Sequence, residues 1–173
     1  MCKNTQIKVV KKKMEATASS SASLAAEITK SASKQTYYTI RFLADHDRIG
    51  NAYRAYGYFR WVDDVIDTKT GTQEEKIAFA GRQQALLNAC YRNEIPKGLC
   101  AEEQMLADLV QHDTEKNSGL RMYLHNMMDV MVFDANRRGK MISQVELFDY
   151  SRKLSVAVTE ALYYFIGHDD PSP

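Results

Sequence analysis

Arg60, Asp63 and Asp67 are spaced so that one face of a helix would present a guanidinium group and two carboxylates together. At roughly 100° per residue, Tyr56 falls on the same narrow stripe. Carboxylates four residues apart lie one turn above each other and repel unless a cation lies beside them. Magnesium is usually held by one or two carboxylates together with substrate phosphates, and the arginine fork matches phosphate oxygens. The stripe therefore has the composition of half of a magnesium–diphosphate site.

A solvent-exposed helix face is the alternative interpretation of the same residues. Arg60 would then pair with Asp63 or Asp67 and stabilise the helix by about 0.2–0.5 kcal/mol. The opposite stripe is apolar and predicts the face that packs on the rest of the protein: Ala55, Phe59, Val62 and Ile66. Any surface helix shows such a segregation, so the spacing alone leaves both interpretations open.

The composition is that of one globular domain without an overall preference for nucleic acid. The chain has 173 residues, of which 45% are hydrophobic and 26% charged, and its net charge is +1. Cys2, Cys90 and Cys100 form no CxxC motif and are odd in number. We therefore expect a reduced compartment and no disulfide framework, and we expect Cys90 and Cys100 to serve as small core residues. No apolar run reaches the ~18 residues that span a bilayer.

The first 33 residues differ from the remainder of the chain. Lysine is concentrated before Glu15, and serine and alanine dominate from Ala16 to Ser33. We expect residues 1–33 to form a flexible segment ahead of a helical domain over residues 34–173. The segment lacks the apolar stretch of a signal peptide but shares some features with transit peptides, so we expect a cytoplasmic protein and leave organellar targeting open. Its lysines would allow weak, peripheral contact with an anionic membrane.

Helical periodicity dominates the chain from about residue 35 onward. The expected helices span residues 22–42, 46–67, 73–92, 101–113, 119–138 and 143–166. Gly71, Pro96 and Gly139 mark breaks between them, and Ser143 with Glu146 forms a capping box for the last helix. These features predict an all-α bundle of about six helices joined by short connections.

Two of the later helices carry unusual residues. The helix over residues 119–138 is apolar nearly all round, which predicts a central position; Asp129 within it needs either a partner or a polar cavity. The methionines of this helix fit a core or the wall of an apolar cavity: Met122, Met127, Met128 and Met131. The last helix carries Tyr150 and, among apolar neighbours, Glu160. Its aromatic side chains are core residues or line a cavity for a carbocation.

Two motifs occur together in the first half of the chain. Ser33-Lys34-Gln35-Thr36-Tyr37-Tyr38 is followed by Tyr56-x-x-x-Arg60-x-x-Asp63-Asp64-x-x-Asp67. This combination resembles the squalene/phytoene synthases, which have a Ser/Thr-Phe-Tyr turn, then an arginine and an Asp-x-x-x-Asp helix. The likeness runs through most of residues 33–167. It implies an all-α fold of the isoprenoid-synthase type and a transferase that joins two prenyl diphosphates, farnesyl or geranylgeranyl diphosphate, head to head.

The resemblance implies a role for each residue that matches the family pattern. Asp63 and Asp67 would bind Mg²⁺ bridging to the substrate diphosphate, and Arg60 would hold phosphate oxygens; these three are the expected catalytic residues. Loss of diphosphate leaves an allylic cation, so Mg²⁺ and Arg60 would neutralise the leaving group while an apolar tunnel excludes water. The other residues expected to bind substrate are Thr36, Tyr56 and Tyr150.

The chain also departs from the family pattern. A second Asp-x-x-x-Asp helix does not follow, and Asp169-Asp170 lies too close to Pro171 to replace it. We therefore expect the N-terminal portion of the family domain, with an apolar face to be covered by a missing half, a second chain or self-association. NADPH use in a full-length enzyme would depend on residues outside this portion. Thr159 and Glu160 stand where the family usually has small residues, which puts the shape of the substrate pocket in question.

A non-catalytic scaffold or assembly factor of the same superfamily is the alternative function. The missing second Asp-x-x-x-Asp helix favours it. The retained stripe of Arg60, Asp63 and Asp67 argues against it, because a scaffold has no need of a charge cluster for diphosphate.

Overall fold

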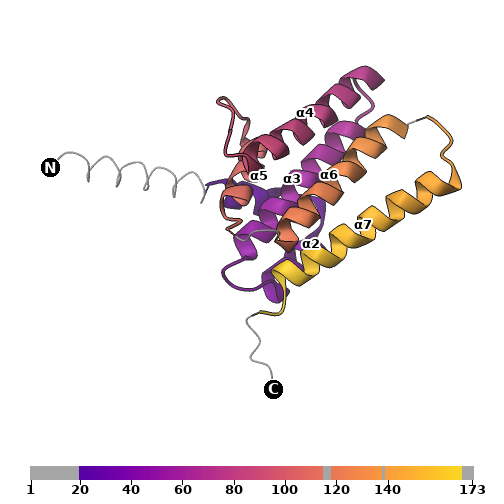
Figure 1. The fold of residues 1–173 in the computed structure, drawn as a ribbon. Helices are drawn as coiled ribbons and strands as arrows, with labels where there is room; N and C mark the ends of the chain where they lie inside the picture. Colours follow the sequence, from indigo (N-terminus) through magenta and orange to yellow (C-terminus); the bar gives the residue numbers. More distant parts are fainter. Residues whose placement is uncertain (1–19, 115–117, 138, 169–173) are drawn as a thin grey trace.

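The computed structural model describes residues 20–114, 118–137 and 139–168. Its elements are helices (Figure 1), in the order α2 (Lys34–Leu43), α3 (Ile49–Asp67), α4 (Gln73–Tyr91), α5 (Ala101–Gln111), α6 (Gly119–Arg137) and α7 (Gln144–Phe165). A further helical segment covers residues 20–32. Within the described ranges, the only pairing of extended backbone is an isolated bridge between Ala44 and Ile166. The predicted all-α class is confirmed, and the ranges expected from residue 46 onward differ only by a few residues at their ends.

Ser33 divides the range 22–42, which the sequence predicts as one helix, into two. Its backbone is extended (φ −152°, ψ 106°), and its side chain accepts a hydrogen bond from the backbone N–H of Thr36 at 3.1 Å. This is the N-cap arrangement, in which a serine satisfies a donor that the helix end leaves unpaired. The predicted capping box of α7 is also present, because Ser143 and Glu146 exchange side-chain-to-backbone hydrogen bonds.

The helical segment 20–32 packs on α3. Ala25 is fully buried, and a Cβ added to Gly57 of α3 would lie 3.2 Å from the backbone of Ala25. The small side chains that suggested a flexible segment are what allow the two helices to approach this closely. Residues 1–19, with the lysine-rich stretch, lie outside the described residues.

A buried polar group ties the same segment to two other helices. Arg54 of α3 is only 6% exposed, and its Nε donates to the Ser21 hydroxyl at 2.9 Å. That hydroxyl in turn donates to the carboxylate of Asp108 on α5 at 2.5 Å. Burial lowers the pKa of Arg54, and the charge of Asp108 opposes this effect. Removing one member would leave a buried charge uncompensated, so the group locks the register of the three helices.

The helix α3 lies among α4, α5 and α6, while α7 packs mainly on α6 at the outer edge (Figure 1). The predicted packed stripe of α3 is confirmed, since its four apolar residues are all buried: Ala55, Phe59, Val62 and Ile66. Phe59 meets Tyr123 of α6 edge to face, with 5.6 Å between ring centroids. This contact contributes beyond its buried area and fixes the rotation of α3, and therefore the direction in which the opposite stripe points.

The outer faces of α2 and α7 carry exposed apolar side chains. Nothing in α2 is buried. The most exposed large apolar residues of the two helices are Phe42 and Leu43 of α2 and Val145, Phe148, Leu162 and Tyr163 of α7. Among the described residues, no helix is both long enough and apolar enough to cross a membrane.

The substitution Gly57→Ala tests the close packing of segment 20–32 on α3. The added methyl group meets the backbone of Ala25, so we expect the free energy of unfolding to fall by about 1–3 kcal/mol. Gly81 of α4 is the matched control, because nothing lies within 4 Å of a Cβ added there. Gly81→Ala should raise the free energy of unfolding by up to about 1 kcal/mol. Urea unfolding followed by circular dichroism measures both, and two effects of the same sign would contradict the packing.

Candidate functional site

The polar stripe of α3 lies on the side of the helix opposite the packed stripe. The Arg60 side chain contacts carboxylates of its own helix. The guanidinium of Arg60 donates to Asp64 through Nη2 at 2.6 Å and through Nε at 3.3 Å. Its distance to the carboxylate of Asp63 is 3.7 Å. The sequence predicted Asp63 or Asp67 as the partner, so the closest partner, Asp64, is a correction. Asp64 lies four residues along the helix, which is the spacing that lets a long side chain reach a carboxylate in ideal geometry.

Asp63 occupies the least favourable electrostatic position on the stripe. Its side chain is half-buried, and burial raises its pKa, with the neighbouring charge of Asp67 as the next cause. Arg60 opposes these effects, whereas Asp64 and Asp134 of α6 raise the pKa of Asp63 further. A carboxylate disfavoured by burial and by like charges gains from a bound cation. Asp63 and Asp67 therefore come together as predicted, with Asp134 as a third contributor.

Asp134 connects the α3 stripe to Tyr150 of α7. Arg137 donates through Nε to Asp134 at 2.5 Å, and the Tyr150 hydroxyl lies 3.5 Å from the other carboxylate oxygen of Asp134. The Arg137 guanidinium also lies over the Tyr150 ring, 5.8 Å from its centroid. Burial raises the pKa of Tyr150, and the charge of Asp134 adds to this. The predicted residue Tyr150 thus belongs to the same polar group, which we name the polar end: Asp63, Asp67, Asp134, Arg137 and Tyr150.

Sequence reasoning missed Asp134 and Arg137. A signal was available, because Asp134 follows Met127 by seven residues and so lies on the same face of α6 two turns later. If Met127 lines a cavity, the same periodicity predicts that Asp134 lies near the end of that cavity.

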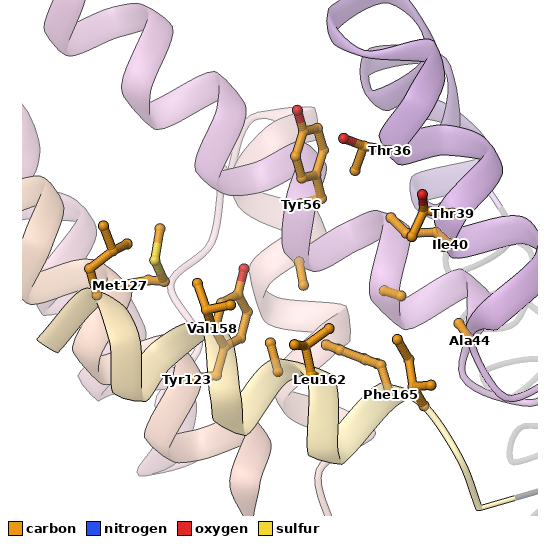
Figure 2. Close-up of a pocket in the computed structure, with 15 residues that line it drawn as sticks. Thr36, Thr39, Ile40, Ala44, Tyr56, Tyr123, Met127, Val158, Leu162 and Phe165 are labelled. Carbon is orange, nitrogen blue, oxygen red and sulfur yellow. The ribbon is translucent and has the colours of Figure 1, made fainter. Parts of the chain in front are cut away.

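A cavity of about 380 Å³ lies between α2, α3, α6 and α7. Its wall is largely apolar, and residues from all four helices contribute to it: Thr36, Ile40, Tyr56, Met127, Leu162 and Phe165. In Figure 2 the hydroxyl-bearing side chains of Thr36 and Tyr56 face each other on one side, above the apolar side chains of α7. Both residues were predicted to bind substrate, and the structure places both in the cavity wall.

The polar end lies beyond one end of the cavity. The helices α6 and α7 run antiparallel, since Lys153 of α7 pairs with Asp129 of α6 at 3.2 Å while Phe165 lies near Tyr123, 6.5 Å between ring centroids. Along α6, Tyr123 and Met127 line the cavity and Asp134 comes after them. The site is therefore polar at one end and apolar along its length, which suits a ligand with a charged head and a hydrocarbon tail.

Thr36 is positioned by α2 and by the contact between α2 and α3. Its hydroxyl donates to the capping hydroxyl of Ser33 at 2.9 Å. The Tyr53 hydroxyl of α3 donates to the carbonyl of Tyr37 at 3.0 Å, and the two tyrosine rings stack with 5.2 Å between centroids. Burial raises the pKa of Tyr53 to about 12, so Tyr53 stays a donor at any ordinary pH. These contacts hold the first turn of α2 beside Tyr56.

Two expectations for α6 are decided by the structure. Asp129 is not buried, since its side chain is 42% exposed, and it pairs with Lys153 and lies 3.4 Å from Gln84. The partner predicted for it is present, but the burial is not. The methionines divide as the open alternatives allowed: Met128 and Met131 are buried, Met127 lines the cavity, and Met122 is exposed.

Comparison with known proteins decides the affiliation of the chain. The family model described as squalene/phytoene synthase matches residues 29–173. The chain belongs to the squalene/phytoene synthase family. The match covers α3, α6 and α7, which carry the polar end, and it confirms the resemblance that the two motifs indicated. Searches of curated proteins and of solved structures returned no match.

The oxygen donors of this squalene/phytoene synthase family member suit a hard cation. Within the described part of the chain, no group of three or more His, Cys, Asp or Glu side chains has the arrangement of a metal site. Two carboxylates one turn apart, such as Asp63 and Asp67, would leave the remaining positions around a cation to oxygens of a substrate or of water. Magnesium is commonly bound in this way, by one or two carboxylates and by substrate phosphates. The residues present thus fit the predicted ion.

The raised pKa of Asp63 has a consequence for stability. The folded state disfavours the charged form of Asp63. Below the ordinary aspartate pKa the side chain is neutral in both the folded and the unfolded state, so it does not lower the free energy of unfolding. Once the pH rises above the raised pKa of the folded state, the charged carboxylate lowers that free energy. We expect Asp63→Asn to increase the free energy of unfolding at pH 7 by roughly a few tenths of a kcal/mol, because partial exposure screens the charges. The gain should vanish below about pH 4.

Asp64→Asn is the matched control for this experiment. It lies next to Asp63 but removes the short ion pair with Arg60, so we expect a small loss of stability at pH 7 instead of a gain. Urea unfolding at pH 3.5, 5 and 7 measures both variants. A stability gain at pH 7 from Asp64→Asn and none from Asp63→Asn would contradict the electrostatics described here.

Proposed function

We propose that this protein binds a prenyl diphosphate and joins it head to head with a second one, the reaction class that its family implies. One observation carries the proposal: the half-buried Asp63, beside Asp67, lies two turns along α3 from Tyr56, which lines an apolar cavity of about 380 Å³. That volume falls in the range of about 300–1,000 Å³ found for small-molecule pockets. An allylic diphosphate has the matching form, a dianionic or trianionic head on a branched hydrocarbon chain.

Each residue of the site has a role in this proposal. Asp63 and Asp67 would hold Mg²⁺, and the ion would supply positive charge to the leaving diphosphate. Arg60 exchanges its contact with Asp64 for the phosphate oxygens, which the guanidinium fork matches equally well. Thr36 and Tyr56 offer hydroxyl groups between the polar end and the tail.

The reaction begins when the bond between C1 and oxygen of the prenyl diphosphate breaks. The electron pair leaves with the diphosphate, and a delocalised allylic cation remains. Positive groups fixed at the leaving oxygens lower this barrier because they are oriented before the charge develops. The apolar wall excludes water that would capture the cation, and the rings of Tyr123 and Phe165 offer π faces toward the same cavity.

Calorimetric titration with farnesyl thiodiphosphate, an analogue that ionises poorly, tests the proposal. We expect binding that requires Mg²⁺, because the carboxylates and the diphosphate repel without it. In the double variant Asp63→Ala/Asp67→Ala this binding should weaken by roughly 100-fold, about 2.7 kcal/mol. Asp64→Ala is the comparison on the same helix: it removes a carboxylate but releases Arg60 from its ion pair, so Mg²⁺-dependent binding should stay the same or tighten, and should not weaken.

The outcomes separate the two candidate functions. Binding that depends on Mg²⁺ and on both carboxylates supports the transferase. The protein could instead be folded and helical by circular dichroism, yet bind no analogue with or without Mg²⁺. That result would favour the non-catalytic scaffold and would contradict the proposed roles of Asp63 and Asp67.

A further inference from the structure

Asp45, in the connection between α2 and α3, is a buried carboxylate that the proposed reaction does not use. It is 4% exposed, and its oxygens accept hydrogen bonds from residues that follow α7. The backbone N–H of Gly167 donates to it at 3.0 Å, and the backbone N–H of His168 donates at 3.1 Å. The Nδ1 of His168 lies 2.7 Å from the second oxygen. Burying a carboxylate is unfavourable unless several donors surround it, and here the donors come from more than 120 residues away in the chain.

Backbone contacts extend this connection on both sides of Asp45. The N–H of Asp45 donates to the carbonyl of Phe165 at 2.9 Å, and Ala44 forms an antiparallel bridge with Ile166. Arg48 donates to the carbonyl of Tyr164, and its guanidinium lies 4.5 Å from the centre of that ring. We call this group of contacts the Asp45 clamp. It joins the C-terminal end of α7 to the start of α3.

The residues that the clamp joins also form one end of the apolar cavity. Ala44, Phe165 and Ile166 all line it. Figure 2 shows Ala44 and Phe165 at the end away from Met127. Along α6, Asp134 of the polar end follows Met127 by two turns. A hydrocarbon tail whose head lies at Asp63 would therefore run toward the wall that the clamp holds in place.

We propose that Asp45 is a positioning residue that fixes the far wall of the cavity and so determines the length of prenyl chain that the cavity accepts. This inference rests on the proposed function for the identity of the ligand. Asp45 itself does not touch the tail; it acts by holding Phe165 and Ile166 against Ala44. Without the buried carboxylate, the N–H groups of Gly167 and His168 lose their acceptor, and the wall formed by Phe165 and Ile166 can move outward.

A merely structural role for Asp45 would have a different consequence. A general loss of stability weakens the binding of every chain length by the same factor. A wall that moves outward changes the ratio between long and short chains, because only a longer tail gains apolar contact from the added space. The ratio of dissociation constants is thus the measurement that separates the two roles.

The experiment uses prenyl alcohols and prenyl thiodiphosphates with 10, 15 and 20 carbons, titrated into the protein and into Asp45→Ala. The alcohols probe the cavity without requiring the diphosphate site. We expect Asp45→Ala to shift the 20-carbon to 15-carbon ratio of Kd values by about tenfold in favour of the longer chain, in both ligand series. Asp47→Ala, two residues away and exposed, is the matched control and should leave the ratio unchanged.

His168→Ala is a milder variant for the case that Asp45→Ala does not fold. It removes only the imidazole contact, keeps both backbone donors, and should shift the same ratio in the same direction by a smaller factor. An unchanged ratio in folded Asp45→Ala, or in His168→Ala where Asp45→Ala does not fold, overturns the inference, as does a wild-type cavity that binds no alcohol. If the alcohols bind with the shifted ratio and the thiodiphosphates do not bind at all, the wall role stands and the proposed function fails.

Discussion

Partial burial of the Asp63 carboxylate, next to the like charge of Asp67, is the constraint on which this site depends. Asp63 is half-buried, and Asp67 and Asp134 act on it with the same sign of charge. Of the arginines nearby, Arg60 makes its short contact with Asp64 and lies 3.7 Å from Asp63, while Arg137 donates to Asp134. The folded chain therefore keeps an arrangement that lowers its own stability, which is typical of sites that are compensated only when a ligand or ion is bound. A stripe evolved only for solubility would have no reason to keep Asp63 partly out of water.

Contacts between the helices hold the carboxylates of α3 and the walls of the cavity in place. Phe59 against Tyr123 sets the rotation of α3, so its acidic face cannot turn into the core. The position of α7 is set along α6 by the pair of Lys153 and Asp129 and, at the far end, by the clamp around Asp45. Because α7 supplies both Tyr150 of the polar end and Phe165 of the cavity wall, its placement relates the head of a ligand to its tail.

Features set by local spacing could be predicted from the sequence, and features set by distant contacts could not. The acidic stripe and packed stripe of α3 follow from a period of 3.6 residues, and the cap at Ser143 follows from residues three apart. The break at Ser33 was not predicted, because residues 22–42 have a continuous helical pattern and only the capping hydrogen bond of Ser33 marks the start of a second helix. Asp45 and Asp134 contact residues of α7 or residues that follow it, and no local spacing in the sequence shows these contacts. Arg60 lies closer to Asp64, four residues away, than to Asp63, three residues away; both spacings allow an ion pair, so the pattern did not decide between them.

A crystal structure of the protein with farnesyl thiodiphosphate and Mn²⁺ in place of Mg²⁺ tests the central claim most directly. A ligand with its head at the polar end and its tail in the apolar cavity predicts an anomalous manganese peak beside the carboxylates of Asp63 and Asp67, with diphosphate density next to it. The farnesyl tail should then run past Tyr56 toward Phe165. Manganese bound elsewhere, or a tail lying outside the space between α2 and α7, would contradict a single site with a charged head and a hydrocarbon body.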